Sequence, residues 1–195
     1  AEYVDRISKG DIPPKITDKY NGDFNEIKNN LNTCVDAINA LVSDANMLSK
    51  AAMEGKLDIR ADGGRHSGDF KKIINGVNGT LDAVIGPLNM AAEYVDRISK
   101  GDIPPRIIDN YYGDFNEIKN NLNELIDSLN NVSYIAGEIA EGNLKVEVIP
   151  RSGEDTLMKR LKEMVSYLQE IAAITNDLAG GNLMVKVNKI GRAHV

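Results

Sequence analysis

The phrase AEYVDRISKGDIPP occupies residues 1–14 and returns unchanged at residues 92–105. A shift of 91 residues aligns residues 1–32 with residues 92–123, and 28 of these 32 positions are identical, with differences only at positions 15, 17, 19 and 21. Self-similarity at a fixed period is the signature of repeat architectures. We therefore expect the two copies to form the same structural unit.

A shorter period lies inside this duplication and is marked by five glycines. They are Gly10, Gly55, Gly101, Gly142 and Gly181, at spacings of 45, 46, 41 and 39 residues. Each glycine is followed by any residue, a large aliphatic residue, three further residues and a second apolar residue. The apolar pairs are Ile12 and Ile16, Leu57 and Ala61, Ile103 and Ile107, Leu144 and Val148, and Leu183 and Val187. Glycine adopts the left-handed conformation that closes a helix, and the Pro-Pro pairs after the first and third glycines prevent its continuation. The pattern predicts five extended connectors, each anchored to neighbouring helices by its apolar pair.

Helices are predicted to restart at an aspartate thirteen or fourteen residues after each of the first four glycines. These aspartates are Asp23, Asp69, Asp114 and Asp155. Asp23 with Glu26 has the spacing of a capping box, in which side chains accept from the free amides of the first helical turn. The copy, Asp114 with Glu117, has the same spacing. These four acidic residues are therefore predicted to stabilise two helix starts.

Apolar residues follow each helix start in alternating steps of three and four. The first stripe is Phe24, Ile27, Leu31, Cys34, Ile38, Leu41, Ala45, Leu48 and Ala52; its copy is Phe115, Ile118, Leu122, Leu125, Leu129, Val132, Ala136 and Ile139; the last is Leu157, Leu161, Met164, Leu168, Ile171, Thr175 and Leu178. A stripe sustained over more than three heptads is typical of a coiled coil or helix bundle, because a lone helix cannot bury it. Roughly thirty residues in each helix give a length of about 45 Å. In the helix from Asp69 the register changes at Gly86-Pro87, where a kink is expected.

The single cysteine and the one internal histidine have ordinary structural interpretations. Cys34 occupies a stripe position whose copy is Leu125, so we expect a small core residue and not a nucleophile. His66 lies in the polar segment GGRHSGD and is expected to be solvated.

Composition and charge argue against several classes of function. Aromatic residues are 5% of the chain and there is no Trp, which suits slender helices. The net charge of −6, without a Lys/Arg cluster, argues against nucleic-acid binding. The most apolar stretch, 81–92, contains Asp82, Gly86 and Pro87 and is shorter than the about 20 residues that a membrane helix needs, so we expect no direct membrane contact and find no signal peptide.

No pattern predicts catalysis, a cofactor or a metal. One cysteine cannot form an internal disulfide, and no Cys/His spacing resembles a metal site, which indicates an intracellular, metal-free chain. The motifs GxGxxG and GxxxxGK are absent, and no Ser or Cys nucleophile has a plausible His base. We expect a protein that is not an enzyme, with no catalytic residues.

Connectors between heptad helices, repeated in tandem, resemble HAMP domains, the linker modules of bacterial receptors. The phrases AEYVDRISKGDIPP, GDFNEIKNNLN and LDAVIGPLN resemble HAMP arrays of methyl-accepting chemotaxis proteins, over the chain to about Asn188. The resemblance implies an all-α, elongated array of parallel four-helix bundles, each made by two chains of a homodimer. It gives the five glycines and the apolar pairs the roles of connector glycines and connector anchors. The family's acidic-Glu-aliphatic-Gly helix start is matched only in part by Asn25-Glu26-Ile27-Lys28 and its copy, because Lys replaces Gly.

The predicted domain organisation follows the connectors. HAMP-like units are expected at residues 1–46, with a truncated first helix, 47–90, which is divergent, 91–132 and 133–175, with a further unit starting at 176–189. Residues 190–195 spell what a common short-read sequencing adapter encodes, and we expect that tail to be non-biological.

The resemblance also implies a function and leaves alternatives open. It implies a non-catalytic relay of conformational change in a bacterial chemoreceptor, in a cytoplasmic segment of an inner-membrane receptor. The expected partners are a second copy of the chain and a downstream signalling module in the same chain. A HAMP array of a sensor histidine kinase and a structural coiled-coil spacer are the alternatives. Ala61 is the smallest second anchor, so the second connector is expected to pack most loosely.

Overall fold

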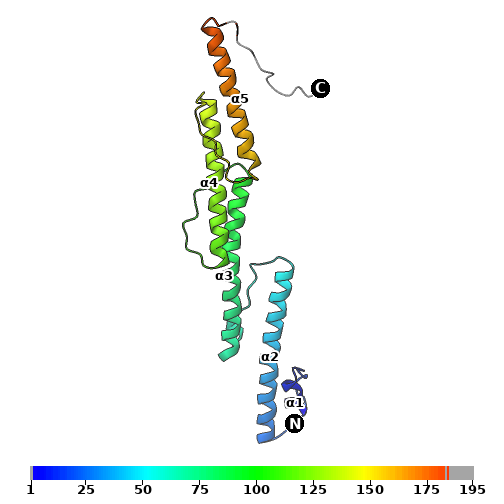
Figure 1. Ribbon diagram of the computed structural model, residues 1–195. Helices are drawn as coiled ribbons and strands as arrows, with labels where there is room; N and C mark the ends of the chain where they lie inside the picture. Colours follow the sequence, from blue (N-terminus) through cyan, green and yellow to red (C-terminus); the bar gives the residue numbers. More distant parts are fainter. Residues whose placement is uncertain (1, 183, 185–195) are drawn as a thin grey trace. The chain divides into compact units, whose positions relative to one another are not determined.

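The computed structural model describes residues 2–182 and 184, and within these residues it contains only helices and loops (Figure 1). The elements are α1 (Glu2–Ser8), α2 (Asp23–Met53), the 3₁₀ turn η1 (Gly63–Arg65), α3 (Gly68–Ser99), α4 (Asp114–Ala140) and α5 (Thr156–Ala179). The prediction of an all-α chain is confirmed. Four connectors join these helices, and we name them in chain order: the first (9–22), second (54–67), third (100–113) and fourth (141–155).

The long helices have the predicted starts and lengths. They contain 31, 32, 27 and 24 residues, and α2 and α4 begin at Asp23 and Asp114. Helix α3 begins at Gly68, one residue before Asp69, while Asp155 is the N-cap residue of α5. Pro87 lies inside α3, so the predicted change of register falls within one uninterrupted helix.

The chain divides into two compact units, Ala1–Ala92 and Glu93–Val195. In the first unit, α2 and α3 run in the same direction, so the second connector returns beside the helices before α3 starts (Figure 1). Leu48 of α2, Ala61 of the connector and Ile74 of α3 form its buried cluster. The connector therefore supplies part of the core that joins the two parallel helices.

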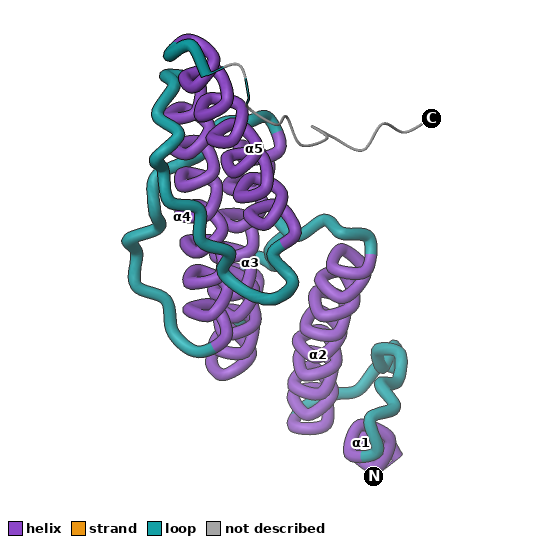
Figure 2. The backbone as a smooth tube through the Cα atoms, turned by 45° about the horizontal axis from the view of Figure 1, so that its top comes forward, coloured by secondary structure: helices purple, strands orange, loops and turns teal. Residues whose placement is uncertain are grey.

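The second unit repeats this arrangement with α4, the fourth connector and α5 (Figure 2). Ile135 of α4, Val148 of the connector, and Met158 and Val165 of α5 form its buried cluster. Burying apolar side chains of this size contributes about 1.5–3 kcal/mol each, which explains why an extended loop remains attached to two helices.

Much of the heptad stripe of α2 lies outside this intrachain core. Phe24 is 71% exposed and Ile27 is 54% exposed, and Cys34 is exposed as well. The residues of α2 that are buried are Val35, Asp44, Leu48 and Ala51. The expectation that Cys34 is a core residue is wrong for the single chain, because the connector covers a neighbouring face of the helix.

Candidate functional site

The connectors begin with a shared helix-ending turn. Positive φ angles of 80, 72, 82, 84 and 88° occur at Gly10, Gly55, Gly101, Gly142 and Gly181. In each case the amide of the following residue donates to the carbonyl five positions back; Asp102 to Arg97, at 3.0 Å, is one example. This is the Schellman arrangement, which satisfies carbonyls that a helix end leaves free. A side chain with a Cβ is strained at such a φ, so glycine is required at these turns.

In the two duplicated copies an ion pair spans this turn. Arg6 donates to Asp11 with an Nε–Oδ2 distance of 2.7 Å, and Arg97 donates to Asp102 at 2.6 Å. These hydrogen bonds hold the pKa of each aspartate below its ordinary value. The pairs are largely exposed, so they orient the start of the connector and add little stability.

In the second, third and fourth connectors the second anchor is buried more deeply than the first anchor. Ala61, Ile107 and Val148 are each 5% exposed, whereas the first anchor Leu57 is 38% exposed. The remaining anchors Ile12, Ile16, Ile103 and Leu144 are partly buried, and Leu183 and Val187 lie outside the described residues. Pro13 and Pro104 are almost fully buried, so the prolines that prevent helix continuation also fill space against the helices.

An asparagine from the following helix binds the backbone of the second anchor in three connectors. In each, the asparagine Oδ1 accepts from the anchor amide while its Nδ2 donates to the same residue's carbonyl. The Oδ1 and Nδ2 distances are 2.7 and 3.0 Å for Asn32 on Ile16, 3.1 and 2.8 Å for Asn78 on Ala61, and 2.7 and 3.0 Å for Asn123 on Ile107. We call this pair of bonds the asparagine clamp. It satisfies backbone groups that a buried loop would otherwise leave unpaired.

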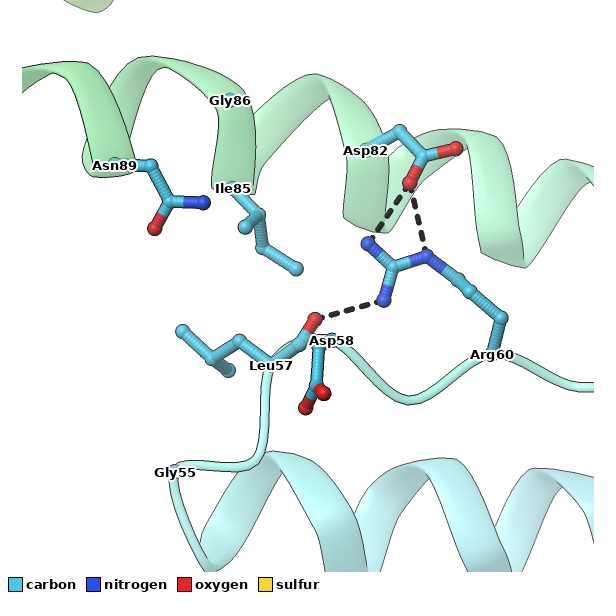
Figure 3. Close-up of a pocket in the computed structure, with 8 residues that line it drawn as sticks. All are labelled: Gly55, Leu57, Asp58, Arg60, Asp82, Ile85, Gly86 and Asn89. Atoms are coloured by element: carbon cyan, nitrogen blue, oxygen red, sulfur yellow. Dashed lines mark hydrogen bonds and ion pairs between the residues drawn. The ribbon is translucent and has the colours of Figure 1, made fainter.

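The same three connectors carry a basic residue that pairs with an aspartate on that helix. The pairs are Lys15–Asp36 at 2.6 Å, Arg60–Asp82 at 2.8 Å and Arg106–Asp127 at 2.5 Å. Figure 3 shows the second pair, in which Arg60 reaches from the connector to Asp82 of α3 and also donates to the carbonyl of Leu57 at 2.7 Å. The connector and α3 border an open groove of ≈ 580 Å³ that Leu57 and Ile85 also line.

Sequence reasoning missed these contacts, although the sequence contains their signal. The motif Asn-x-x-x-Asp occurs within the helix after a connector at Asn32–Asp36, Asn78–Asp82 and Asn123–Asp127, and once more at Asn110–Asp114, where the asparagine precedes the helix. Residues four apart lie on the same helix face, so both side chains can reach one loop. The fourth connector and α5 lack these residues. Glu147 precedes the second anchor Val148 in place of a basic residue. Val165 and Gln169 lie 17 and 21 residues after Val148, at the spacing that Asn78 and Asp82 have after Ala61.

The fourth connector is held in place by different contacts. Asp155 caps α5 by accepting from the Met158 amide at 3.2 Å, and Arg151 donates to the same carboxylate at 2.7 Å. These hydrogen bonds, above all those from Arg151, hold the pKa of Asp155 far below its ordinary value. Val148 and Val165 meet in the apolar core in place of an asparagine clamp.

A family model described as the HAMP domain matches residues 1–40 and 65–131, which together are more than half of the chain. The chain belongs to the HAMP domain family. HAMP domains are non-catalytic segments that relay signals, so this chain is a signal-relay segment. The matched stretches contain the first and third connectors, both with the glycine turn, the anchors and the asparagine clamp. No solved structure matches the chain.

The helix-start residues of the HAMP units require one correction. Asp23, Glu26, Asp114 and Glu117 all lie in first helical turns, but the predicted capping boxes are wrong, because Gly22 and Gly113 are the N-cap residues and no side chain caps either helix. Their φ values of 56 and 54° place these glycines in the left-handed region. The aspartates that follow lie inside the helix, where a negative charge interacts favourably with the N-terminal dipole.

His66 requires a second correction. It was expected to be solvated, yet it is buried, and its Nε2 lies 2.7 Å from Oδ2 of Asp44, which is buried as well. The aspartate lies in α2, 22 residues earlier, so no short-range sequence pattern predicts the contact. Close by, a Cβ at Gly63 would meet the Oδ1 of Asn75 in α3, and that exposed side chain would have to turn away.

Two features of the described residues concern metal binding and membrane spanning. Within residues 2–182 and 184, no cluster of three or more His, Cys, Asp or Glu side chains is arranged to bind a metal ion. Among the helices of that same part of the chain, none has the length and hydropathy needed to cross a membrane.

Proposed function

We propose that this chain is a tandem array of HAMP units that works as a parallel homodimer in a bacterial chemoreceptor. The recurrence of one connector geometry supports the array: each of the four described connectors has a positive-φ glycine in its helix-ending turn, and each buries or partly buries its second apolar anchor. The unit at 133–175 lies outside the family matches, and the unit at 47–90 lies inside them only from residue 65, yet both have this glycine turn and a buried second anchor.

The exposed stripe of α2 is the observation that carries the homodimer. Phe24 and Ile27 are more than half exposed, whereas Leu41 and Leu48, farther along the same stripe, pack in the cluster with the second connector. A heptad stripe that one chain leaves in water is buried when a second copy supplies the same stripe. The stripe of α5 is exposed in the same way at Leu157, which is 52% exposed, and at Leu178, which is 46% exposed.

The proposed relay is a shift between two packings of each bundle. A change of tilt or rotation in the entering helix alters which packing is more stable by a few kcal/mol, and the exit helix passes the change to the next unit. The anchors Ala61 and Val148 each pack in a cluster with residues of both helices of their unit, so they are placed to stabilise one packing. Downstream lies the proposed output module of the same chain, on the cytoplasmic side of an inner membrane.

Cysteine cross-linking tests the parallel homodimer. Oxidation should link Cys34 of one copy to Cys34 of another, and a cysteine at Leu125, in a Cys34→Ser background, should also link to itself. The matched control, Ser43→Cys with Cys34→Ser, places the thiol on an exposed site on the opposite side of α2 and should not link. A monomer in sedimentation, or linking of the Ser43 control alone, would contradict the proposal.

Anchor substitutions test the relay itself. In the full receptor, Ile103→Ala or Leu144→Ala should shift the balance between its signalling states at equal abundance. Ile108 is the control, because it lies in the same connector as Ile103 but is 90% exposed, so Ile108→Ala should change nothing. Unchanged signalling in both anchor variants would leave a structural spacer as the function.

The coding sequence downstream decides the type of receptor. A long methyl-accepting hairpin identifies a chemoreceptor, whereas a His-bearing dimerisation helix followed by an ATP-binding domain identifies a sensor kinase. The interrupted heptads argue against a plain spacer, because a spacer gains nothing from a connector in each unit.

A further inference from the structure

Asp44 and His66 form a buried polar contact between α2 and the second connector. Their side chains are 3% and 1% exposed, and His66 Nε2 lies 2.7 Å from Asp44 Oδ2. The other carboxylate oxygen accepts from Arg65 at 3.1 Å, but this guanidinium is 57% exposed and therefore screened by water. His66 is thus the principal partner of the buried carboxylate.

The duplicated helix shows what this contact replaces. The residue of α4 that aligns with Asp44 is Ile135, which is 1% exposed and belongs to an apolar cluster with Val148. In the second connector the corresponding anchor is Ala61, whose side chain offers much less apolar surface. In the first unit a polar contact therefore occupies the position that apolar side chains fill in the second unit.

We propose that Asp44 and His66 are positioning residues, a polar latch that selects one position of the second connector on α2. Hydrogen bonds are directional, so the latch specifies where the connector lies, which the small methyl group of Ala61 cannot do. Charged and polar groups buried in this way lose their partner at high cost if the connector moves. The proposal rests on the proposed relay function and adds to it. The latch restricts the HAMP-like unit at 47–90 to one packing, whereas the units with larger apolar anchors are not restricted in this way.

Hydrogen–deuterium exchange of the whole chain tests the latch without any signalling readout. The reporter is the peptide 54–67, where the Ala61 amide is bonded to Asn78, and the internal control is the peptide 100–113, where the Ile107 amide is bonded to Asn123. His66→Leu should accelerate exchange in 54–67 by about 100-fold, since removing one partner leaves a buried carboxylate uncompensated. Exchange in 100–113 should stay unchanged.

Conservative and apolar variants separate positioning from general stability. His66→Gln keeps an amide donor that can reach Asp44, so it should restore most of the protection of 54–67. Arg65→Gln should have little effect. The double variant Asp44→Ile/His66→Leu copies the apolar solution of α4 and should retain helix content while peptide 54–67 stays poorly protected.

Several outcomes would overturn the latch. One is that His66→Leu leaves exchange in peptide 54–67 unchanged, and another is that it accelerates peptides 54–67 and 100–113 equally. The others are that His66→Gln does not restore protection of 54–67, and that the apolar double variant protects 54–67 fully. Each of these leaves the proposed relay untouched, because the signalling test uses Ile103 and Leu144. If the anchor variants leave signalling unchanged while the exchange results support the latch, only the proposed relay is contradicted.

Discussion

Replacing Asn123 by alanine tests the asparagine clamp most directly. Its Oδ1 lies 2.7 Å from the Ile107 amide nitrogen and its Nδ2 lies 3.0 Å from the Ile107 carbonyl oxygen, and both bonds are buried. Alanine removes both partners and leaves one backbone donor and one backbone acceptor unsatisfied. Each costs about 1–3 kcal/mol, so we expect Asn123→Ala to lower the free energy of unfolding by about 2–4 kcal/mol.

The assay is urea denaturation followed by circular dichroism, at one protomer concentration because association contributes to stability. Asn120→Ala is the matched control: it changes an exposed asparagine of the same helix and should alter stability by less than about 0.5 kcal/mol. Asn32→Ala should cost less than Asn123→Ala, because the equivalent clamp on Ile16 is only partly buried.

Asn123→Asp separates the two bonds of the clamp. It keeps an acceptor for the Ile107 amide but presents a second oxygen, in place of a donor, to the Ile107 carbonyl. We expect it to be at least as destabilising as Asn123→Ala. The clamp has no energetic role if Asn123→Ala and Asn120→Ala unfold at the same urea concentration.

Three further predictions concern single positions. Gly101→Ala should destabilise by about 1–2 kcal/mol because the φ of 82° is strained for alanine, whereas Gly79→Ala, with open space inside α3, should stabilise by about 0.5–1 kcal/mol; thermal unfolding measures both. Ile135→Asp, which copies Asp44 without its histidine, should destabilise by about 3 kcal/mol or more, and a smaller loss in the urea midpoint would show that water reaches this core. Arg151 lowers the pKa of Asp155 far below its ordinary value, so this pair stabilises the fold above the ordinary pKa, and the contribution is lost progressively as pH falls from there to the lowered pKa. Arg151→Gln should therefore be less stable than the parent at pH 7, with the gap in urea midpoints narrowing, without closing, as pH falls to 3. A gap that does not change with pH would contradict this.

Local chemistry explains why so much of the fold was predictable from the residues. Gly101 ends a helix because its φ is positive, and Asp114 starts the next helix, so both boundaries follow from short-range rules. The apolar anchors followed from repetition: the same spacing after each glycine indicated a shared position in the fold. The capping boxes failed because Gly22 and Gly113, one position earlier, already fill the cap.

Contacts between distant segments explain what sequence patterns did not predict. The Asn-x-x-x-Asp motif was visible, but its meaning depends on a connector 16 or 17 residues earlier that must run back beside the helix. His66 was misjudged because its polar neighbours in sequence suggested water, while its partner Asp44 lies on the preceding helix.

By itself, the sequence determined the helical class, the repeat, the connector turns and the membership of residues in apolar stripes, because backbone conformation and periodicity are set by neighbours along the chain. The tertiary structure alone decided which face of α2 the connector covers, that the stripe at Phe24 and Ile27 is left exposed, and that an aspartate and a histidine share a buried site. The reason is physical: burial and the pairing of charges depend on which segments meet in space, and the residues that meet here are separated by one helix or one connector.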